Sequence, residues 1–289
     1  MSLLDIKLHR PQSVAQAVKL LSELEDARCL AGGTDLLVDI KDGLVHVKNL
    51  VSLQDIRELR TIDAEDTGIR IGALVTPEEL IKSPVIQEHF PVLGEAASLM
   101  GSAEIRSMAT VGGNIASAVP SADLPPCLIA AEATVTLDCG SPREVPLLEF
   151  FKGPRETVCG GAEILTSVWL PFPQPRTGMS YQKFSLREAN ALAVVGVASR
   201  ITLEEERIAK ALVVLGAVAP TPVLAEKASG LLIGRGPSER LFEEAASAAR
   251  EDARPITDIR GSLWYRKELI EVLTRRSLEE ALARARRCD

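Results

Sequence analysis

Two short runs of glycine and polar side chains have the composition of a ligand site. Residues 110–123 read TVGGNIASAVPSAD, and residues 31–36 read AGGTDL. Gly112 and Gly113 can reach φ > 0 and let the backbone approach a ligand closely. Successive exposed N–H groups in such a turn form a concavity that binds anions such as phosphate. Residues 110–123 are therefore a candidate phosphate cradle, and the alternative is an ordinary glycine turn with polar neighbours.

The upstream run, residues 31–36, has the local context of a phosphate site. It follows a short apolar pair, Cys29 and Leu30, and precedes a second apolar run. Strand, glycine turn and helix in this order place backbone amides where a helix N-terminus holds phosphate. Thr34 and Asp35 are also common helix N-caps, so the alternative is a capped helix start. Two such runs in one chain predict a diphosphate held from two sides.

Other polar residues could complete this site. A ribose, a ribityl chain or a ring edge could be fixed by the donors and acceptors of Thr110, Asn114, Ser117 and Asp123. Gly101, in a polar stretch just before the main run, could bring the backbone close to the same ligand. Residues 181–193 read YQKFSLREANALA, and Lys183 in this segment could stabilise the anionic reduced ring of a flavin. The alternative for this segment is a solvated loop.

Length and charge narrow the functional class. The chain has 289 residues, enough for two domains, and a formal net charge of −7. A nucleic-acid binder neutralises phosphates with a basic face, so this net charge disfavours that class. No apolar run approaches the ~20 residues of a membrane span, and the N-terminus lacks the residue order of a signal peptide. We therefore expect a cytoplasmic protein.

Cysteine and histidine spacing predicts no metal site on this chain. The five cysteines stand at positions 29, 127, 139, 159 and 288, an odd number without a CxxC pair. This pattern disfavours both a disulfide framework and an iron–sulfur cluster. The histidines at 9, 46 and 89 are scattered, without zinc-ligand spacing or a Ser–His–Asp arrangement. We expect most of the cysteines to be small buried hydrophobic residues.

The elements that must position these residues fall into two domains. Residues 171–178 read PFPQPRTG, which is typical of a linker. Residues 1–175 alternate strands and helices, with a small βαβ subdomain at about 1–55 and a second subdomain at 56–175. Residues 176–289 predict a three-stranded antiparallel sheet and then three helices. The expected strands are 179–186, 193–203 and 207–215, and the expected helices are 225–232, 238–251 and 262–286. The fold class is therefore α+β.

The segments together resemble a known family. In chain order they are AGGTDLL, IR at 105–106, ATVGGNIASAVPSADLPP, EILTSVWLP and YxKFxxREANALA. Over essentially its whole length the chain is similar to the FAD-binding (medium) subunit of molybdenum hydroxylases, of the xanthine dehydrogenase and aerobic carbon monoxide dehydrogenase type. The resemblance implies a two-subdomain PCMH-type FAD-binding domain, shared with vanillyl-alcohol oxidase and the cell-wall enolpyruvyl reductases. It also implies an α+β C-terminal domain containing the three-stranded sheet.

The resemblance also implies which residues bind FAD. In the family the first glycine run contacts the diphosphate and adenosine side, and here it corresponds to Cys29, Leu30, Ala31, Gly32, Gly33, Thr34, Asp35 and Leu36. The second run follows the diphosphate and ribityl chain, and here it corresponds to Thr110, Gly113, Asn114, Ala116, Ser117 and Asp123. Ile164 and Leu165 match a segment near the flavin or adenine, and Lys183 matches a lysine at the flavin ring.

The resemblance further implies an electron-transfer role without oxidation of the organic substrate. A large subunit with the molybdenum cofactor oxidises that substrate, and a small subunit carries [2Fe–2S] clusters. FAD then passes the electrons to NAD⁺, a quinone or oxygen. The expected assembly is a dimer of heterotrimers. A free-standing FAD-dependent oxidase or reductase of the same fold, and a non-catalytic nucleotide-binding module, are the alternatives.

Two departures from the family pattern limit what carries over. Relatives that reduce aromatic acyl-CoA thioesters hold a [4Fe–4S] cluster in a cysteine-rich insertion. This chain runs directly from Asn114 to Asp123, so we expect no such cluster. NAD⁺-using xanthine dehydrogenases have an acidic residue near the flavin N5 atom. The matching position here is Asn190, so NAD⁺ does not carry over as the acceptor.

Overall fold

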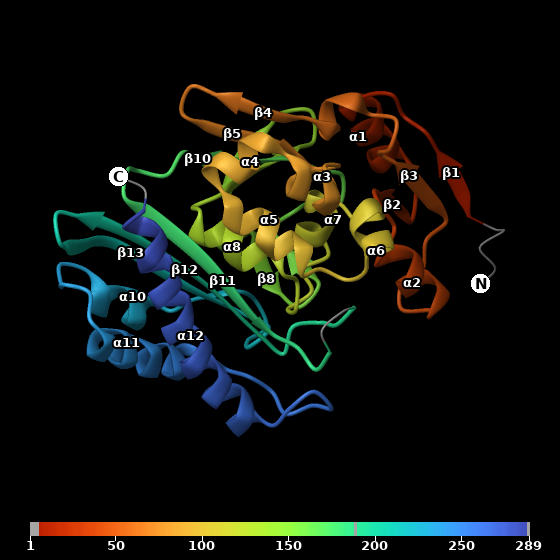
Figure 1. Cartoon of the computed structure of the whole chain (residues 1–289). Coiled ribbons are helices and arrows are strands. Elements are labelled where there is room, and N and C mark those ends of the chain that lie inside the picture. Colours follow the sequence, from red (N-terminus) through yellow and green to blue (C-terminus); the bar gives the residue numbers. More distant parts are fainter. Residues whose placement is uncertain (1–5, 188–189, 288–289) are drawn as a thin grey trace.

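The computed structural model of the chain describes residues 6–187 and 190–287 (Figure 1). Glu188 and Ala189, in the segment 181–193 that contains Lys183, lie outside these described residues, and so does Cys288. Along the chain there are three sheet-centred units, which we call the first, second and third unit. They correspond to about residues 6–56, 57–171 and 177–287, and the class is α+β.

The first unit is a parallel three-stranded sheet with two helices. Its strands are β1 (Lys7–His9), β2 (Ala27–Leu30) and β3 (Asn49–Ser52), in the order β1-β3-β2. All four residues of the central strand β3 are buried. Helices α1 (Val14–Glu23) and α2 (Leu36–Lys41) form the connections. The predicted βαβ unit is confirmed, and β1 adds an edge strand too short to give a sequence signal.

The second unit is a five-stranded antiparallel sheet in the order β4-β5-β10-β6-β7. Its strands are β4 (Ile62–Glu65), β5 (Gly68–Gly72), β6 (Thr134–Asp138), β7 (Arg143–Pro146) and β10 (Ile164–Pro171). Its helices are η2 (Arg57–Arg60), α3 (Pro77–Lys82), α4 (Pro84–His89), α5 (Pro91–Ser98), α8 (Leu124–Ala130) and α9 (Leu147–Phe150). Three of the helices begin at a proline, a residue whose fixed φ suits the first helical position.

The polar stretch before and within the main glycine run is helical, which corrects the expectation of a glycine turn. Helix α6 (Ala103–Met108) is capped by Ser102, and helix α7 (Val111–Ala116) is capped by Thr110. Each capping hydroxyl accepts a hydrogen bond from the backbone N–H three residues later. The sequence pattern hid these helices because each has only six residues and few apolar positions.

The third unit contains the predicted antiparallel strands β11 (Thr177–Phe184), β12 (Val195–Glu204) and β13 (Arg207–Gly216). A two-residue strand, β14 (Val223–Leu224), adds a fourth member at the edge. The three predicted helices are α10 (Glu226–Leu232), α11 (Glu239–Asp252) and α12 (Leu263–Ala285). The predicted linker is shorter than expected, because β10 ends at Pro171 and β11 begins at Thr177.

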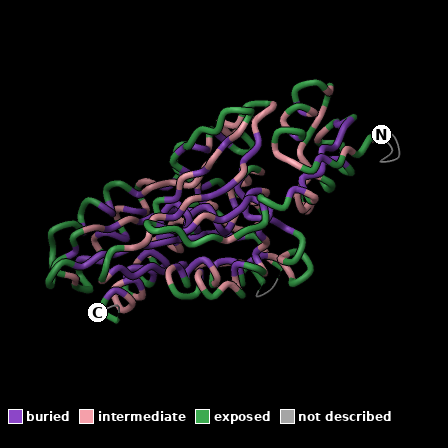
Figure 2. The backbone as a smooth tube through the Cα atoms, turned by 90° about the horizontal axis from the view of Figure 1, so that it is seen from above, coloured by how far each residue is buried: buried purple, intermediate pink, exposed green. Residues whose placement is uncertain are grey.

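The third unit packs tightly against the second. Helix α12 lies on one face of the β11–β13 sheet and α8 of the second unit contacts the other face (Figure 1). The sheet is therefore covered on both sides, and every residue of β12 except Glu204 is buried. Figure 2 shows that buried backbone runs through the middle of the molecule and that exposed segments lie mostly around it. None of the helices among the described residues is long and apolar enough to cross a bilayer.

Candidate functional site

A cavity of about 850 Å³ lies where the three units meet. That volume is within the ~300–1,000 Å³ typical of ligand and cofactor sites. Both glycine runs line it, and so does the segment that connects β11 to β12. Except for Leu30 and Lys183, all predicted site residues lie on its wall: Cys29, Ala31, Gly32, Gly33, Thr34, Asp35, Leu36, Gly101, Thr110, Gly113, Asn114, Ala116, Ser117, Asp123, Ile164 and Leu165.

The first glycine run is an open loop with free backbone donors. Gly33 has φ +74°, a conformation that side chains disfavour. Among the described residues, no protein acceptor receives a hydrogen bond from the N–H groups of Gly32, Gly33 or Thr34. Unpaired N–H groups that converge on a cavity suit an anion. This loop therefore has the chemistry expected of a phosphate cradle.

The two glycine runs touch each other. A β-carbon on Gly32 would lie 1.9 Å from the backbone oxygen of Met108 and 3.0 Å from the Cα atom of Ala109. Met108 and Ala109 directly precede Thr110, where the second run begins. Glycine at position 32 thus allows the first unit to approach the second, and it brings the two runs to one wall of the cavity.

The second glycine pair does not form a concavity of free amides, which corrects the sequence expectation. Gly112 and Gly113 lie in the first turn of α7, and neither has a positive φ. The Gly112 N–H donates to the Ala73 oxygen at 2.9 Å, and the Gly113 N–H donates to the Thr110 hydroxyl at 3.0 Å. A β-carbon on Gly112 would meet the Ala73 β-carbon at 2.6 Å. Gly112 is therefore a packing glycine.

The second run instead offers space and an unsatisfied side chain. A β-carbon on Gly113 would meet only the Thr110 hydroxyl oxygen within 4 Å, so this position otherwise opens onto the cavity. The Oδ1 atom of Asn114 is buried without a hydrogen-bond partner among the described residues. A buried polar atom without a partner is costly unless a ligand or water satisfies it. The free amides of the first run, the opening at Gly113 and this oxygen together fit a dinucleotide.

Asp123 is held by the third unit. The Tyr181 hydroxyl donates to its Oδ1 atom at 2.9 Å, and the Lys183 ammonium donates to its Oδ2 atom at 2.9 Å. Burial raises the pKa of the Asp123 carboxyl, although Lys183 and Tyr181 act to lower it. Burial, together with the negative charge of Asp123, raises the pKa of Tyr181. The Lys183 side chain is 4% exposed, so it acts on the cavity through Asp123.

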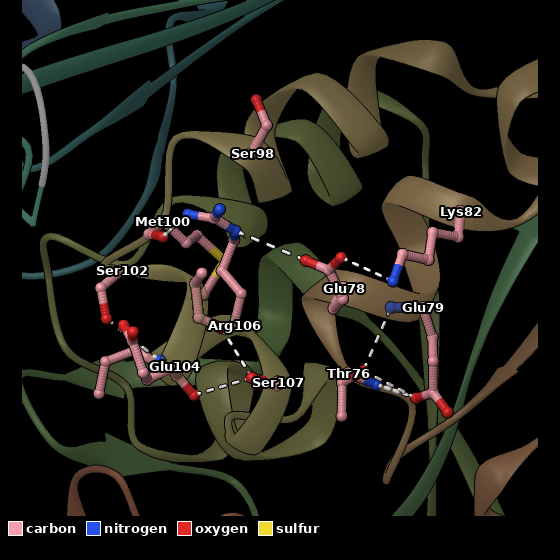
Figure 3. Close-up of polar contacts among 12 residues, drawn as sticks. Thr76, Glu78, Glu79, Lys82, Ser98, Met100, Ser102, Glu104, Arg106 and Ser107 are labelled. Carbon is pink, nitrogen blue, oxygen red and sulfur yellow. Dashed lines mark hydrogen bonds and ion pairs between the residues drawn. The ribbon is translucent and has the colours of Figure 1, made fainter.

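Two cations hold the turn that carries Gly101. Lys183 donates to the Leu99 oxygen at 2.8 Å, and Arg106 donates to the Met100 oxygen at 3.1 Å. Figure 3 shows Arg106 reaching from α6 toward Glu78 of α3, with 3.9 Å between its Nε atom and the Glu78 carboxylate. Gly101 itself has φ +43°. The turn therefore has a fixed shape where it borders the cavity.

Sequence reasoning missed one wall of the cavity. This wall is a segment of residues 151–163, which we call the strap. The strap contains β8 (Phe151–Gly153) and β9 (Glu156–Thr157). Its cavity-lining residues are Lys152, Arg155, Glu156, Thr157, Cys159, Gly160, Gly161 and Glu163. Residues 160–161 are a third Gly-Gly dipeptide near polar residues, and this dipeptide was the sequence signal that could have identified the strap as part of the site.

Two cysteines face the cavity without the character of nucleophiles. Burial raises the pKa of Cys29 to about 12 and that of Cys159 to about 11. A thiol reacts as its thiolate, so both side chains are inert at neutral pH. Among the described residues, no group of three or more histidine, cysteine, aspartate or glutamate side chains is placed to hold a metal ion. The chemistry of the wall is that of binding.

Comparisons with known proteins agree with this geometry. The family model described as the FAD binding domain in molybdopterin dehydrogenase matches residues 4–173. The model described as the CO dehydrogenase flavoprotein C-terminal domain matches residues 180–281. The chain is 34% identical to the carbon monoxide dehydrogenase medium chain of Afipia carboxidovorans, over 96% of this chain and 97% of that one.

Further relatives extend the likeness. The chain is 31% identical to a putative xanthine dehydrogenase FAD-binding subunit of Escherichia coli, over 96% of each chain. A solved carbon monoxide dehydrogenase from Hydrogenophaga pseudoflava matches with a TM-score of 0.95 and 33% identity, over 98% of this chain and 99% of that one. The PCMH-type fold expected from the sequence is thereby confirmed. The chain belongs to the family of FAD-binding flavoprotein subunits of molybdenum-containing dehydrogenases.

Proposed function

We propose that this chain is the FAD-carrying electron-transfer subunit of a multi-subunit molybdenum hydroxylase. In this role it takes electrons from [2Fe–2S] clusters of a partner subunit and passes them to an external acceptor. The observation that carries the proposal is one cavity that combines the free amides of residues 32–34 with the unsatisfied oxygen of Asn114. These groups suit a diphosphate and the polar chain next to it.

The residues of the cavity have distinct tasks in this proposal. The N–H groups of Gly32, Gly33 and Thr34 hold the diphosphate, and Gly113 leaves room for it. Asn114 and Ser117 bind the ribityl chain. Asp123 and Lys183 form a buried ion pair beside the flavin ring, where they influence the charge that the ring can hold. Bound FAD supplies the redox chemistry.

The partners of the proposed complex follow from the relatives. Those relatives include medium chains of carbon monoxide dehydrogenases, and the solved enzyme from Hydrogenophaga pseudoflava lacks the Mo-pyranopterin moiety of its molybdenum cofactor. We propose a large molybdenum-cofactor subunit and a small [2Fe–2S] subunit as partners, in a dimer of heterotrimers. The organic substrate is oxidised on the large subunit, and FAD is the cofactor that this chain contributes.

The acceptor side of the proposal depends on the segment between β11 and β12. Asn190 and Leu192 lie on the cavity wall, and Asn190 stands where NAD⁺-using relatives have an acidic residue. We propose an acceptor other than NAD⁺. We also propose domains at 1–175 and 176–289, supported by the end of β10 at Pro171 and the start of β11 at Thr177. A cytoplasmic location stays a prediction.

Purification of the native complex tests the proposed function. The expected result is a complex with one FAD per copy of this chain, together with a large and a small partner, molybdenum and iron. The isolated chain should bind FAD and should not oxidise organic substrates. A colourless chain that takes up no FAD in excess would reject the proposal. Substrate oxidation by the chain alone would favour a free-standing oxidase or reductase.

A further inference from the structure

An ion pair beside the cavity joins the strap to the first unit. Arg155 of the strap donates to both carboxylate oxygens of Asp39 in α2, and its Nη2 atom lies 3.1 Å from Oδ1. The two residues are 116 positions apart in the sequence. The Asp39 side chain is 10% exposed and that of Arg155 is 52% exposed. A two-pronged contact of this kind fixes the orientation of both groups.

The backbone of Arg155 makes a second connection. Its N–H donates to the Ala118 oxygen at 2.9 Å, and Ala118 lies within the second glycine run, directly after Ser117, the C-cap of α7. Arg155 has φ +62° and Ala118 has φ +46°, a conformation that costs energy for residues other than glycine. The surrounding contacts therefore hold this turn of the strap in one shape.

Arg155 thus connects both glycine runs. Its side chain reaches α2, the helix that begins at the last residue of the first run, and its main chain reaches Ala118 within the second run. Arg155 also lies on the cavity wall. The other end of the strap is anchored separately, because Arg143 donates to both carboxylate oxygens of Glu163 at 2.6 and 2.8 Å. The Arg155–Asp39 pair is therefore the cross-link between the strap and the first unit.

We propose that Arg155 is a positioning residue that clasps the dinucleotide site. The clasp keeps the two glycine runs at a fixed separation, so that a ligand held by both leaves only when the Arg155–Asp39 contact opens. This inference rests on the proposed function, because the ligand is FAD. It adds that the residence time of FAD depends on the Arg155–Asp39 pair, which holds the two runs together, although Asp39 itself does not line the cavity.

The test is the rate of FAD release from the full-length FAD-loaded chain, followed by the fluorescence of free flavin after dilution. Asp39→Asn and Arg155→Gln should each speed release roughly tenfold, which corresponds to about 1.4 kcal/mol. The double variant should release FAD no faster than either single variant, because both changes break one contact. Arg155→Lys should give an intermediate rate, because lysine keeps the charge and loses the fork.

A matched control is available in the first unit. Arg10 and Asp55 form a similar two-pronged pair at 2.8 and 3.1 Å, and neither residue lines the cavity. Arg10→Gln should leave the release rate unchanged. Thermal unfolding of all variants, monitored by circular dichroism, shows whether any faster release merely follows a loss of stability.

Three results would overturn the clasp. If Arg155 held the diphosphate directly, Asp39→Asn would free it for that contact and would slow release or leave it unchanged. Additive effects of the two single changes would show that the residues act separately. Release at the wild-type rate in both single variants would remove the pair from the site. A wild-type chain that binds no FAD would reject the proposed function together with the clasp, whereas the other results concern the clasp alone.

Discussion

The two glycine pairs that border the cavity have the same sequence, Gly-Gly, but they have different physical roles. Gly32 and Gly33 lie in an open loop, where φ is +74° at Gly33 and the backbone donors are free. Gly112 and Gly113 lie inside α7, where Ala73 and Thr110 accept from their N–H groups. The first pair supplies hydrogen-bond donors for an anion. The second pair supplies close packing and room, and its neighbour Asn114 supplies the polar atom.

A Gly-Gly dipeptide therefore predicts that some group approaches the backbone closely, but it does not by itself predict whether that group is a ligand or another part of the protein. At Gly32 and Gly112 the approaching group is the protein's own backbone or β-carbon. At Gly113 a β-carbon would meet only the Thr110 hydroxyl, and we propose that the ligand approaches there. Four substitutions would each alter one part of this comparison, and their expected effects decrease from Gly32→Ala to Thr110→Ala.

Gly32→Ala should be the most damaging change. Its β-carbon would lie 1.9 Å from the Met108 backbone oxygen, and a backbone group cannot rotate away as a side chain can. We expect the free energy of unfolding to fall by about 5 kcal/mol, at the upper end of single substitutions. Denaturant unfolding of the full chain measures this. A variant of wild-type stability would show that the two runs do not need this close contact.

Lys183→Met should remove the contact by which the third unit anchors Asp123 of the second run, while the backbone donors of the first run stay intact. It leaves the buried Asp123 carboxylate without a counter-charge, which costs about 3–5 kcal/mol. The raised pKa of Asp123 should rise further, so the penalty should shrink as the pH falls through that pKa and the carboxyl takes a proton. The flavin midpoint potential should also decrease, because the remaining negative charge disfavours the anionic reduced ring.

Thermal unfolding over a range of pH and a redox titration measure these effects. Lys210→Met is the control, since Lys210 is 40% exposed and its partner Glu132 keeps a second ion pair with Arg200. A stability loss in Lys183→Met that is independent of pH would contradict the assigned role of Asp123. An unchanged flavin potential would mean that the pair does not act on the ring.

Gly113→Val should weaken FAD binding while the chain stays folded. The added side chain meets the Thr110 hydroxyl and then projects into the cavity. We expect FAD affinity to fall roughly 100-fold, about 2.7 kcal/mol, measured by titration of the flavin-free chain. Gly230→Val is the matched control for helix propensity, because Gly230 lies in α10 and a β-carbon there would meet nothing within 4 Å. Equal FAD affinity in the two variants would move the ligand away from Gly113.

Thr110→Ala should have the smallest effect of the four. It removes the acceptor of the Gly113 N–H at the start of α7, and loss of such a cap costs about 1 kcal/mol. Thr76→Ala removes the cap of α3, which does not border the cavity, at a similar cost. Only Thr110→Ala should also weaken FAD binding, because it removes a hydroxyl that lines the cavity and loosens the first turn of α7 beside the ligand. Matching FAD affinities would restrict the role of Thr110 to helix capping.

Local signals in the sequence predicted the elements well where they were strong. The long strands of the third unit and its three helices are examples, since their signals lie within a few residues of each other. The positions of both glycine runs were likewise visible in the sequence. Family resemblance, and not periodicity, joined these runs to FAD.

Tertiary structure decided how those residues are used. Partners that lie dozens of residues away determine whether Gly112 faces a ligand or Ala73. They also determine whether Lys183 faces a flavin or Asp123. The Arg155–Asp39 pair has no local pattern, because its contact spans 116 positions. The sequence by itself determined where the backbone can bend and which groups can bind. Only the packing of three units determined which of those groups stay free, because each hydrogen bond made within the protein removes a donor from the ligand.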